Sequence, residues 1–228
     1  MRQFDANTFV CFIDISGFKR ELQRNLQSAS NMLDTFYSAG YRTLKSYPTL
    51  NGIFVSDCGI IYPDKGKLTE RLEAILKAVK DINERMLENN FLTTASIAYG
   101  HLEYKRKFVF DRMKKNAIMG NGYLNAFLDT ENQTNKLIAG QVRITKQIDD
   151  DQPPANIFEQ LDFNNSTLKF LEDKNSHFYY HWYLDKPSEK EKGNKVFTSF
   201  TKSKSDNKFD TLKTNLKQLH NGQQTSRK

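Results

Sequence analysis

The chain has 228 residues, which is enough for one domain with a full core, or for one domain with an appendage. No apolar run approaches the ~20 residues of a membrane-spanning helix, so we expect no membrane segment, and we recognise no signal peptide. The formal net charge is +7. Residues 186–228 hold ten Lys and one Arg against two Glu and two Asp, so the other 185 residues are neutral as a whole. This distribution argues against nucleic-acid binding by the body and predicts a solvated basic tail.

The two cysteines, Cys11 and Cys58, each lie beside a carboxylate inside an apolar run. Two thiols in a chain of this length do not indicate a disulfide framework, and without a CxxC motif they do not indicate structural zinc. We therefore expect a cytoplasmic protein with reduced thiols.

The first predicted elements are a strand, a long helix and a hairpin. Residues 9–15 form a near-continuous run of apolar, β-branched and aromatic residues, which predicts a buried strand. A helical period follows over residues 18–46, and Pro48 ends it, since the residue before proline avoids the helical region. Residues 50–55 and 59–62 then predict two strands of a hairpin.

A second helix is predicted over residues 67–88 and a fourth strand over residues 93–101. The order β-α-β-β-α-β is that of the ferredoxin-like α+β arrangement, with an antiparallel sheet and both helices on one side. Further elements are expected to elaborate it. They are a short strand at 107–110, a helix at 121–134, strands at 137–146 and 177–184, a polar loop at 149–154, a disordered linker at 186–207 and a short amphipathic helix at 209–219. We expect a domain over residues 1–185 and a basic, flexible tail over residues 186–228.

Two carboxylates stand out against this pattern. Asp14 lies near the end of a strand that is otherwise apolar, where a carboxylate is costly to bury without a partner. Asp57 lies at the tip of the predicted hairpin, and the first strand is expected beside the third. Neighbouring carboxylates on adjacent strands predict a hard-oxygen site for Mg²⁺ or Mn²⁺, and two such ions serve in-line phosphoryl displacement. The alternative is that Asp14 caps the following helix.

The turn after Asp14 adds a second feature. The helix after Ser16-Gly17 begins with free backbone N–H groups and the positive end of its dipole, which favour phosphate. Gly17 allows a phosphate to approach the backbone, and Lys19 and Arg20 follow closely.

Five segments in the same order and spacing resemble the class III adenylate and guanylate cyclases, over roughly residues 7–146. They read FVCFIDISGF, GIFVSDCGII, ASIAYGHLEY, NAIMGNGYLNAFLDTE and LIAGQVRIT. This resemblance implies that a nucleoside triphosphate is cyclised to a 3′,5′-cyclic monophosphate and pyrophosphate, at sites between the subunits of a homodimer. It implies that Asp14 and Asp57 hold two Mn²⁺ or Mg²⁺ ions with the Ile15 carbonyl. It also implies nucleotide contacts from Phe12, Ser16, Gly17 and Phe18.

The chain departs from the purine cyclases at the positions that read the base. Ile53 stands where adenylate cyclases have a lysine, and Ala117 stands where they have Asp or Thr. The positions of the usual Asn and Arg of the later helix hold Leu124 and Leu128. Asn125 fits with a one-residue shift, but no Arg matches.

A bacterial branch of the family is more similar. Gly120, Tyr123, Ala126 and Phe127, followed by an Arg143-Ile144 strand, resemble the pyrimidine cyclases of Pycsar anti-phage systems. The Glu of that pattern is replaced by Thr130, between Asp129 and Glu131. The resemblance implies cyclic UMP or cyclic CMP as product and a cyclic-nucleotide-responsive effector as indirect partner.

Two further nucleotide-binding candidates each have a plain alternative. Tyr47 is our candidate for base reading, or else a tyrosine that packs at a helix end. Arg143 is a candidate for binding phosphate, or else an exposed strand arginine. His177 and His181 share a strand face, where we expect ordinary sheet packing rather than metal binding.

The sequence therefore predicts a uridylate cyclase that converts UTP to cyclic UMP for anti-phage defence. The alternatives are a cytidylate cyclase, a purine cyclase, or a non-catalytic nucleotide-binding member of the fold.

Overall fold

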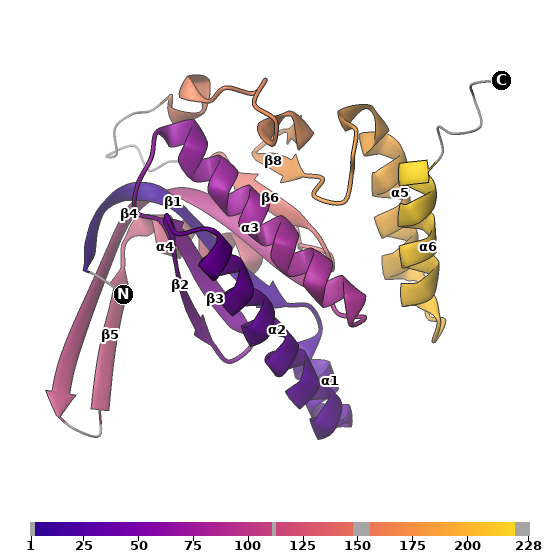
Figure 1. The fold of residues 1–228 in the computed structure, drawn as a ribbon, viewed down its shortest axis with the longest axis horizontal. Coiled ribbons are helices and arrows are strands. Elements are labelled where there is room, and N and C mark those ends of the chain that lie inside the picture. The colour runs from indigo at the N-terminus through magenta and orange to yellow at the C-terminus, as the bar shows by residue number, and fades with distance from the viewer. Residues whose placement is uncertain (1–2, 111–112, 148–155, 222–228) are drawn as a thin grey trace.

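The structure, a computed structural model, describes residues 3–110, 113–147 and 156–221. Within them the chain folds around an eight-stranded sheet with the order β2-β3-β1-β4-β6-β8-β7, and β5 pairs with β4 (Figure 1). The strands are β1 (Phe4–Ile15), β2 (Leu50–Val55), β3 (Cys58–Pro63), β4 (Thr93–Phe110), β5 (Met113–Met119), β6 (Val142–Thr145), β7 (Leu171–Lys174) and β8 (His177–Tyr180). The helices are α1 (Phe18–Arg24), α2 (Leu26–Ser46), α3 (Leu68–Glu88), α4 (Asn121–Thr130), α5 (Lys190–Lys202) and α6 (Lys208–Asn221), with short 3₁₀ turns at Ile157–Gln160, Leu168–Phe170 and Pro187–Glu189.

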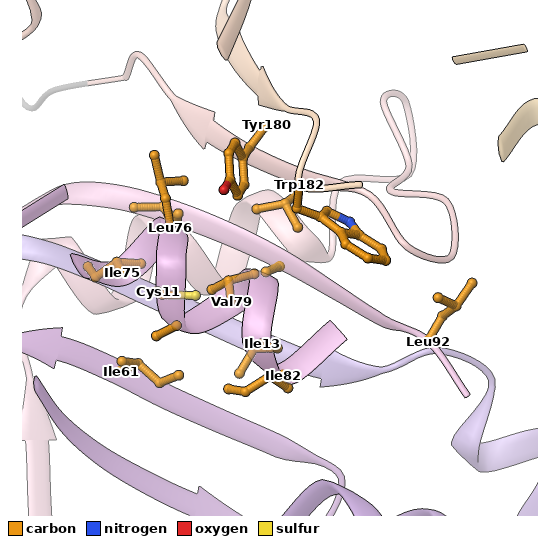
Figure 2. Packing of buried hydrophobic residues seen from close by; sticks show 14 of the residues in the cluster. Cys11, Ile13, Ile61, Ile75, Leu76, Val79, Ile82, Leu92, Tyr180 and Trp182 are labelled. Carbon is orange, nitrogen blue, oxygen red and sulfur yellow. The ribbon is translucent and has the colours of Figure 1, made fainter. Parts of the chain in front are cut away.

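The predicted β-α-β-β-α-β core is confirmed. Strands β2, β3, β1 and β4 are antiparallel neighbours, and α2 and α3 pack on one face of them. The apolar stripe of α3 lies over β1 and β3, as Figure 2 shows. That view labels Ile75, Leu76, Val79 and Ile82 of the helix, which lie beside Cys11, Ile13 and Ile61 of the strands. The side chains that recur every 3.6 residues on the helix thus pack in one core against those that alternate along the strands.

Helix α4 packs on the opposite face of the sheet, against a second and smaller cluster of buried side chains. The cluster consists of Val10, Phe12, Ile60, Tyr62, Ala98, Leu102 and Ala126. The two faces of the sheet are therefore distinct, and the sheet separates α4 from α2 and α3.

The helix predicted over residues 18–46 is two helices. Asn25 has extended backbone geometry, and its side chain accepts a hydrogen bond of 3.0 Å from the Ser28 backbone N–H, which caps α2. The fourth strand continues past residue 101 to Phe110, so the strand expected at 107–110 is its distal part. Strand β5 was not predicted, and it forms a hairpin with β4 that extends beyond the rest of the sheet (Figure 1).

Three later elements are shorter than predicted. The helix expected over 121–134 ends at Thr130, the strand expected over 137–146 is confined to β6, and the strand expected over 177–184 ends at Tyr180. Strand β6 runs parallel to β4, so the complete sheet is mixed rather than antiparallel. The polar loop expected at 149–154 lies outside the described residues.

The linker expected over residues 186–207 is wrong, because α5 occupies much of that range. Phe197 and Phe200 of α5 are buried in the main core, and the Phe197 ring centroid lies 4.3 Å from that of Tyr183. The expected amphipathic helix at 209–219 is confirmed by α6, although the division of the chain at residue 185 stays a prediction. Among the described helices, none combines the length and the apolar character needed to cross a membrane.

Candidate functional site

Strand β1 alternates strictly between the two faces of the sheet. Phe9, Cys11, Ile13 and Ile15 belong to the core under α2 and α3, whereas Val10 and Phe12 belong to the cluster under α4. Asp14 is next in that second series, so its carboxylate lies on the α4 face.

Asp57 occupies the two-residue turn between β2 and β3, directly beside the end of β1. The strand register pairs Asp14 with Cys58, and the Ile15 backbone N–H donates a hydrogen bond of 2.9 Å to the Asp57 carbonyl oxygen. The structure therefore brings together the two carboxylates that the sequence singled out. Because β1 continues through Asp14 and Ile15 into the turn before α1, Asp14 is a strand residue, and the N-cap of α1 is Gly17.

The electrostatics of this pair favour a cation. Burial, and then the neighbouring charges of Asp57 and Glu131, raise the pKa of Asp14 to about 7. A hydrogen bond from the Ile15 backbone lowers this pKa, but by less. In the described part of the chain no salt bridge reaches either aspartate. No group of three or more His, Cys, Asp or Glu side chains there is placed to hold a metal ion. A cation at this place would therefore depend on the two aspartates and on backbone oxygens.

The turn after β1 is compact at Ser16 and open at Gly17. The Ser16 hydroxyl is buried without a hydrogen-bond partner among the described residues. Gly17 has a φ of 81°, and a Cβ added there would meet no atom within 4 Å. These two residues suit a bound ligand, whereas the Phe18 side chain points into the main core and is unavailable for contact.

Helix α4 covers the same face of the sheet next to β1. The Phe12 ring packs edge-on against Phe127 at 5.3 Å and lies 6.4 Å from Tyr123, centroid to centroid. Phe12 is thus a packing residue between β1 and α4, and a nucleotide contact from its side chain is not supported. The Asn125 Nδ2 is buried and has no partner among the described residues, so Asn125 stays a candidate.

Tyr47 lies on the opposite face of the sheet from Asp14. Its ring packs against the main core, on the side of α2 and α3. Burial, followed by the charge and hydrogen bond of Asp81 and the charge of Glu84, raises the pKa of Tyr47 to about 12. The alternative of a helix-end packing tyrosine is the one that the structure supports.

Arg143 is neither exposed nor available to phosphate. Its side chain is 0% exposed, and its three nitrogens donate to protein acceptors. The acceptors are the Asp129 carboxylate and the backbone carbonyls of Asp129 and Asn135. The sequence suggested either a phosphate-binding residue or an exposed strand arginine, and the buried ion pair of Arg143 with Asp129 contradicts both.

The two histidines of the β8 segment are buried and hydrogen-bonded to carboxylates. His177 Nε2 lies 2.8 Å from Asp129 Oδ1, and His181 Nε2 lies 2.9 Å from Glu172 Oε2. This agrees with the expectation of packing rather than metal binding, although the carboxylate partners were not foreseen.

Two neighbours of the site were missed. Glu131, at the C-terminal end of α4, lies close enough to Asp14 to raise its pKa, and Cys58 is paired with Asp14 across the strands. Glu131 flanks the position where the family pattern has Glu, and that was the signal that could have identified it.

Comparisons with known proteins bear on the fold. No family model and no curated protein matches the sequence. Among solved structures, the adenylyl cyclase CyaB from P. aeruginosa superposes with a TM-score of 0.52 at 14% identity, covering 78% of this chain and 95% of that chain. The guanylate cyclase domain of RhGC from Catenaria anguillulae, in complex with GTP, gives 0.53 at 12% identity, covering 78% of this chain and 96% of that chain. A bacterial light-regulated adenylyl cyclase gives 0.55 at 12% identity, covering 95% of this chain and 58% of that chain.

The chain therefore has the α+β fold of class III adenylyl and guanylyl cyclase catalytic domains.

Proposed function

We propose that this chain is a nucleotidyl cyclase that converts UTP to 3′,5′-cyclic UMP and pyrophosphate at a site around Asp14 and Asp57. One observation carries the proposal. Two carboxylates from adjacent strands meet on one face of a cyclase-like fold, without a salt-bridge partner in the described residues. A fold alone does not define an activity, and this pair is the part of the fold suited to the chemistry.

The residues at this place fit a divalent cation. Two carboxylates and the Ile15 carbonyl are hard oxygen donors of the kind that Mg²⁺ and Mn²⁺ prefer. Burial, and then the charges of Asp57 and Glu131, raise the pKa of Asp14 to about 7, and a bound cation would offset these costs of ionisation. When bound, two such ions lower the pKa of the 3′-hydroxyl and neutralise the triphosphate.

The chain's own residues orient the substrate. The 3′-oxygen attacks the α-phosphorus as its proton leaves, the bond from that phosphorus to the β-phosphate bridging oxygen breaks, and pyrophosphate departs. Asp14 and Asp57 would hold the cations that neutralise the triphosphate, and the open turn at Gly17 leaves room for that end of the substrate. The Asn125 Nδ2, which has no partner among the described residues, can donate a hydrogen bond to a phosphate oxygen on which negative charge develops.

The preference for a pyrimidine rests on the lining of the same face. Ile53 pairs across the strands with Ile60 of the α4-face cluster, so it lies on the face that carries Asp14. There it presents an apolar side chain where adenylate cyclases have a base-reading lysine. We keep CTP, and then ATP or GTP, as alternative substrates, and nucleotide binding without turnover as the alternative function.

A homodimer with sites at its interface is part of the proposal. On the outer side of α4, Leu124 is 48% exposed and Leu128 is 52% exposed, and Val55 beside the Asp57 turn is 62% exposed. These apolar side chains would be covered by a second copy of the chain. We further propose that the enzyme acts in the cytoplasm in anti-phage defence and that its product activates a separate effector.

The test measures pyrophosphate release from each of the four nucleoside triphosphates, with Mn²⁺ and with Mg²⁺. We expect release from UTP by the wild-type protein, and at least a hundredfold slower release by Asp14→Asn and by Asp57→Asn. Asp34→Asn, which alters an exposed carboxylate on α2, is the matched control and should behave as wild type. Absence of release from every nucleotide would refute the proposed activity. Equal loss in the control would refute the assigned site.

A further inference from the structure

We propose that Asp129, Arg143 and His177 form a positioning network. It holds helix α4 on the sheet so that Asn125 and Glu131 keep their places relative to Asp14. This inference rests on the proposed function and names the residues that keep its site in register.

The N-terminal end of α4 is fixed to β4. The Asn121 Oδ1 accepts a hydrogen bond of 2.8 Å from the His101 backbone N–H. Gly100 and Gly122 allow the two backbones to approach, since a Cβ on Gly122 would lie 2.9 Å from the Gly100 carbonyl oxygen. This end of the helix therefore has little freedom to shift.

The C-terminal end of α4 is fixed by the carboxylate of Asp129, which is buried and hydrogen-bonded from three strands. Its Oδ2 accepts from Ser96 Oγ of β4 at 2.6 Å and from Arg143 Nε of β6 at 2.7 Å. Its Oδ1 accepts from Arg143 Nη2 and from His177 Nε2 of β8, each at 2.8 Å. Burial alone would raise the pKa of Asp129, but the hydrogen bonds from His177, Arg143 and Ser96 lower it to about 2. The carboxylate is therefore ionised at neutral pH.

Arg143 also binds the backbone beyond the ion pair. Its Nη2 donates to the Asp129 carbonyl oxygen and its Nη1 to the Asn135 carbonyl oxygen, each at 2.7 Å. A rigid guanidinium fork thus holds both the side chain and the backbone at the end of α4. A buried ion pair contributes little net stability compared with an apolar replacement. We therefore infer that the main effect of this ion pair is to fix the position of α4.

Asn125 lies midway between the two anchors. Asn121, Asn125 and Asp129 are spaced four residues apart, so they share a face of α4. The outer two have partners, while the Asn125 Nδ2 is buried and unpaired among the described residues. Glu131, two residues beyond Asp129, is near enough to raise the pKa of Asp14. A shift of α4 would displace both groups, and a displacement of about 1 Å can cost about 100-fold in rate.

The central variant is His177→Ala, which removes one hydrogen bond to Asp129 and leaves Asp14 and Asp57 intact. His181→Ala is the matched control, because His181 is also buried in the β8 segment and hydrogen-bonded to a carboxylate, but it contacts Glu172 rather than α4. We expect His177→Ala to lower kcat about 10- to 100-fold with little change in KM, and His181→Ala to leave kcat unchanged. His177→Gln, which keeps an N–H donor for Asp129, should restore most of the loss.

A double-mutant cycle separates positioning from a general loss of stability. If His177 acts through Asn125, the kcat loss in the pair His177→Ala/Asn125→Ala is smaller than the product of the two single losses. Hydrogen exchange of residues 121–131, measured without nucleotide or metal, should be faster in His177→Ala than in His181→Ala. If His177→Ala does not fold, Ser96→Ala removes another hydrogen bond to the same carboxylate.

The outcomes distinguish the two proposals. A wild-type protein that consumes no nucleotide refutes the proposed function. An active wild type whose folded His177→Ala variant keeps full kcat and normal exchange at 121–131 refutes the positioning network alone. Multiplicative losses in the double-mutant cycle refute it as well.

Discussion

Replacing Asp14 by Asn is expected to stabilise the metal-free protein while abolishing the proposed activity. Burial, and then the charges of Asp57 and Glu131, raise the pKa of Asp14 from 3.8 to about 7 in the folded protein. A rise of that size corresponds to roughly 4 kcal/mol of destabilisation once Asp14 is ionised, and partial hydration of the carboxylate reduces this figure. The cost exists because the folded protein then holds an ionised carboxylate that is largely removed from water and lies near the charges of Asp57 and Glu131.

The pH dependence has a definite sign. Between pH 4 and pH 7 the folded state keeps the Asp14 proton that the unfolded state has lost. The contribution of Asp14 to the free energy of unfolding therefore falls as pH rises through this window and stays low above pH 7. The Asn variant has no such proton, so its advantage over wild type should be up to roughly 4 kcal/mol at pH 8 and less than half of that at pH 5.

The assay is urea unfolding in EDTA at pH 5 and pH 8, followed by the fluorescence of Trp182, the chain's single tryptophan, which is buried in the core. Burial lowers the pKa of His181, which adds stability as pH rises, but this contribution is the same in both proteins and cancels in their difference. Adding Mn²⁺ should stabilise the wild type and leave Asp14→Asn unchanged. If Asp14→Asn is no more stable than wild type at pH 8, the electrostatic account of the pair is wrong.

Three further perturbations test the rest of the structure by urea unfolding followed by circular dichroism. Asp129→Ala leaves the buried Arg143 without its counter-charge and should cost about 3–5 kcal/mol, and a loss below 1 kcal/mol would contradict the buried ion pair. Phe197→Ala should cost about 3–5 kcal/mol if α5 belongs to the core, whereas a flexible tail predicts no change. Gly122→Ala places a Cβ 2.9 Å from the Gly100 carbonyl oxygen, so it should lower both stability and UTP turnover, and unchanged values would show that α4 is not tightly seated.

The first four strands and the helices α2 and α3 were predictable because their signals are local, whereas the break between α1 and α2 was not predicted. An apolar run with Asp14 at its end, two helical stripes and a hairpin with Asp57 at its tip determine the element order. That order implies which strands are neighbours. The sequence alone therefore predicts that Asp14 and Asp57 lie close together.

The features that were missed depend on contacts between distant segments. Nothing in the residues around Arg143 signals that it will pair with Asp129 of α4, or that His177 of β8 will bind the same carboxylate. The face on which Tyr47 packs is set by α3 rather than by its own helix. The Lys-rich composition around Phe197 suggested a linker, although a few aromatic side chains suffice to anchor a helix when a matching surface exists.

The most direct test of the central claim is a competition in one tube. The wild-type protein is incubated with Mn²⁺ and equal concentrations of UTP, CTP, ATP and GTP, and the products are identified by mass. The account predicts that cyclic UMP accumulates with an equal amount of pyrophosphate, and that neither forms with Asp57→Asn. A mixture left unconsumed by the wild type would contradict the cyclase proposal, and a dominant cyclic AMP or cyclic GMP product would contradict the pyrimidine preference.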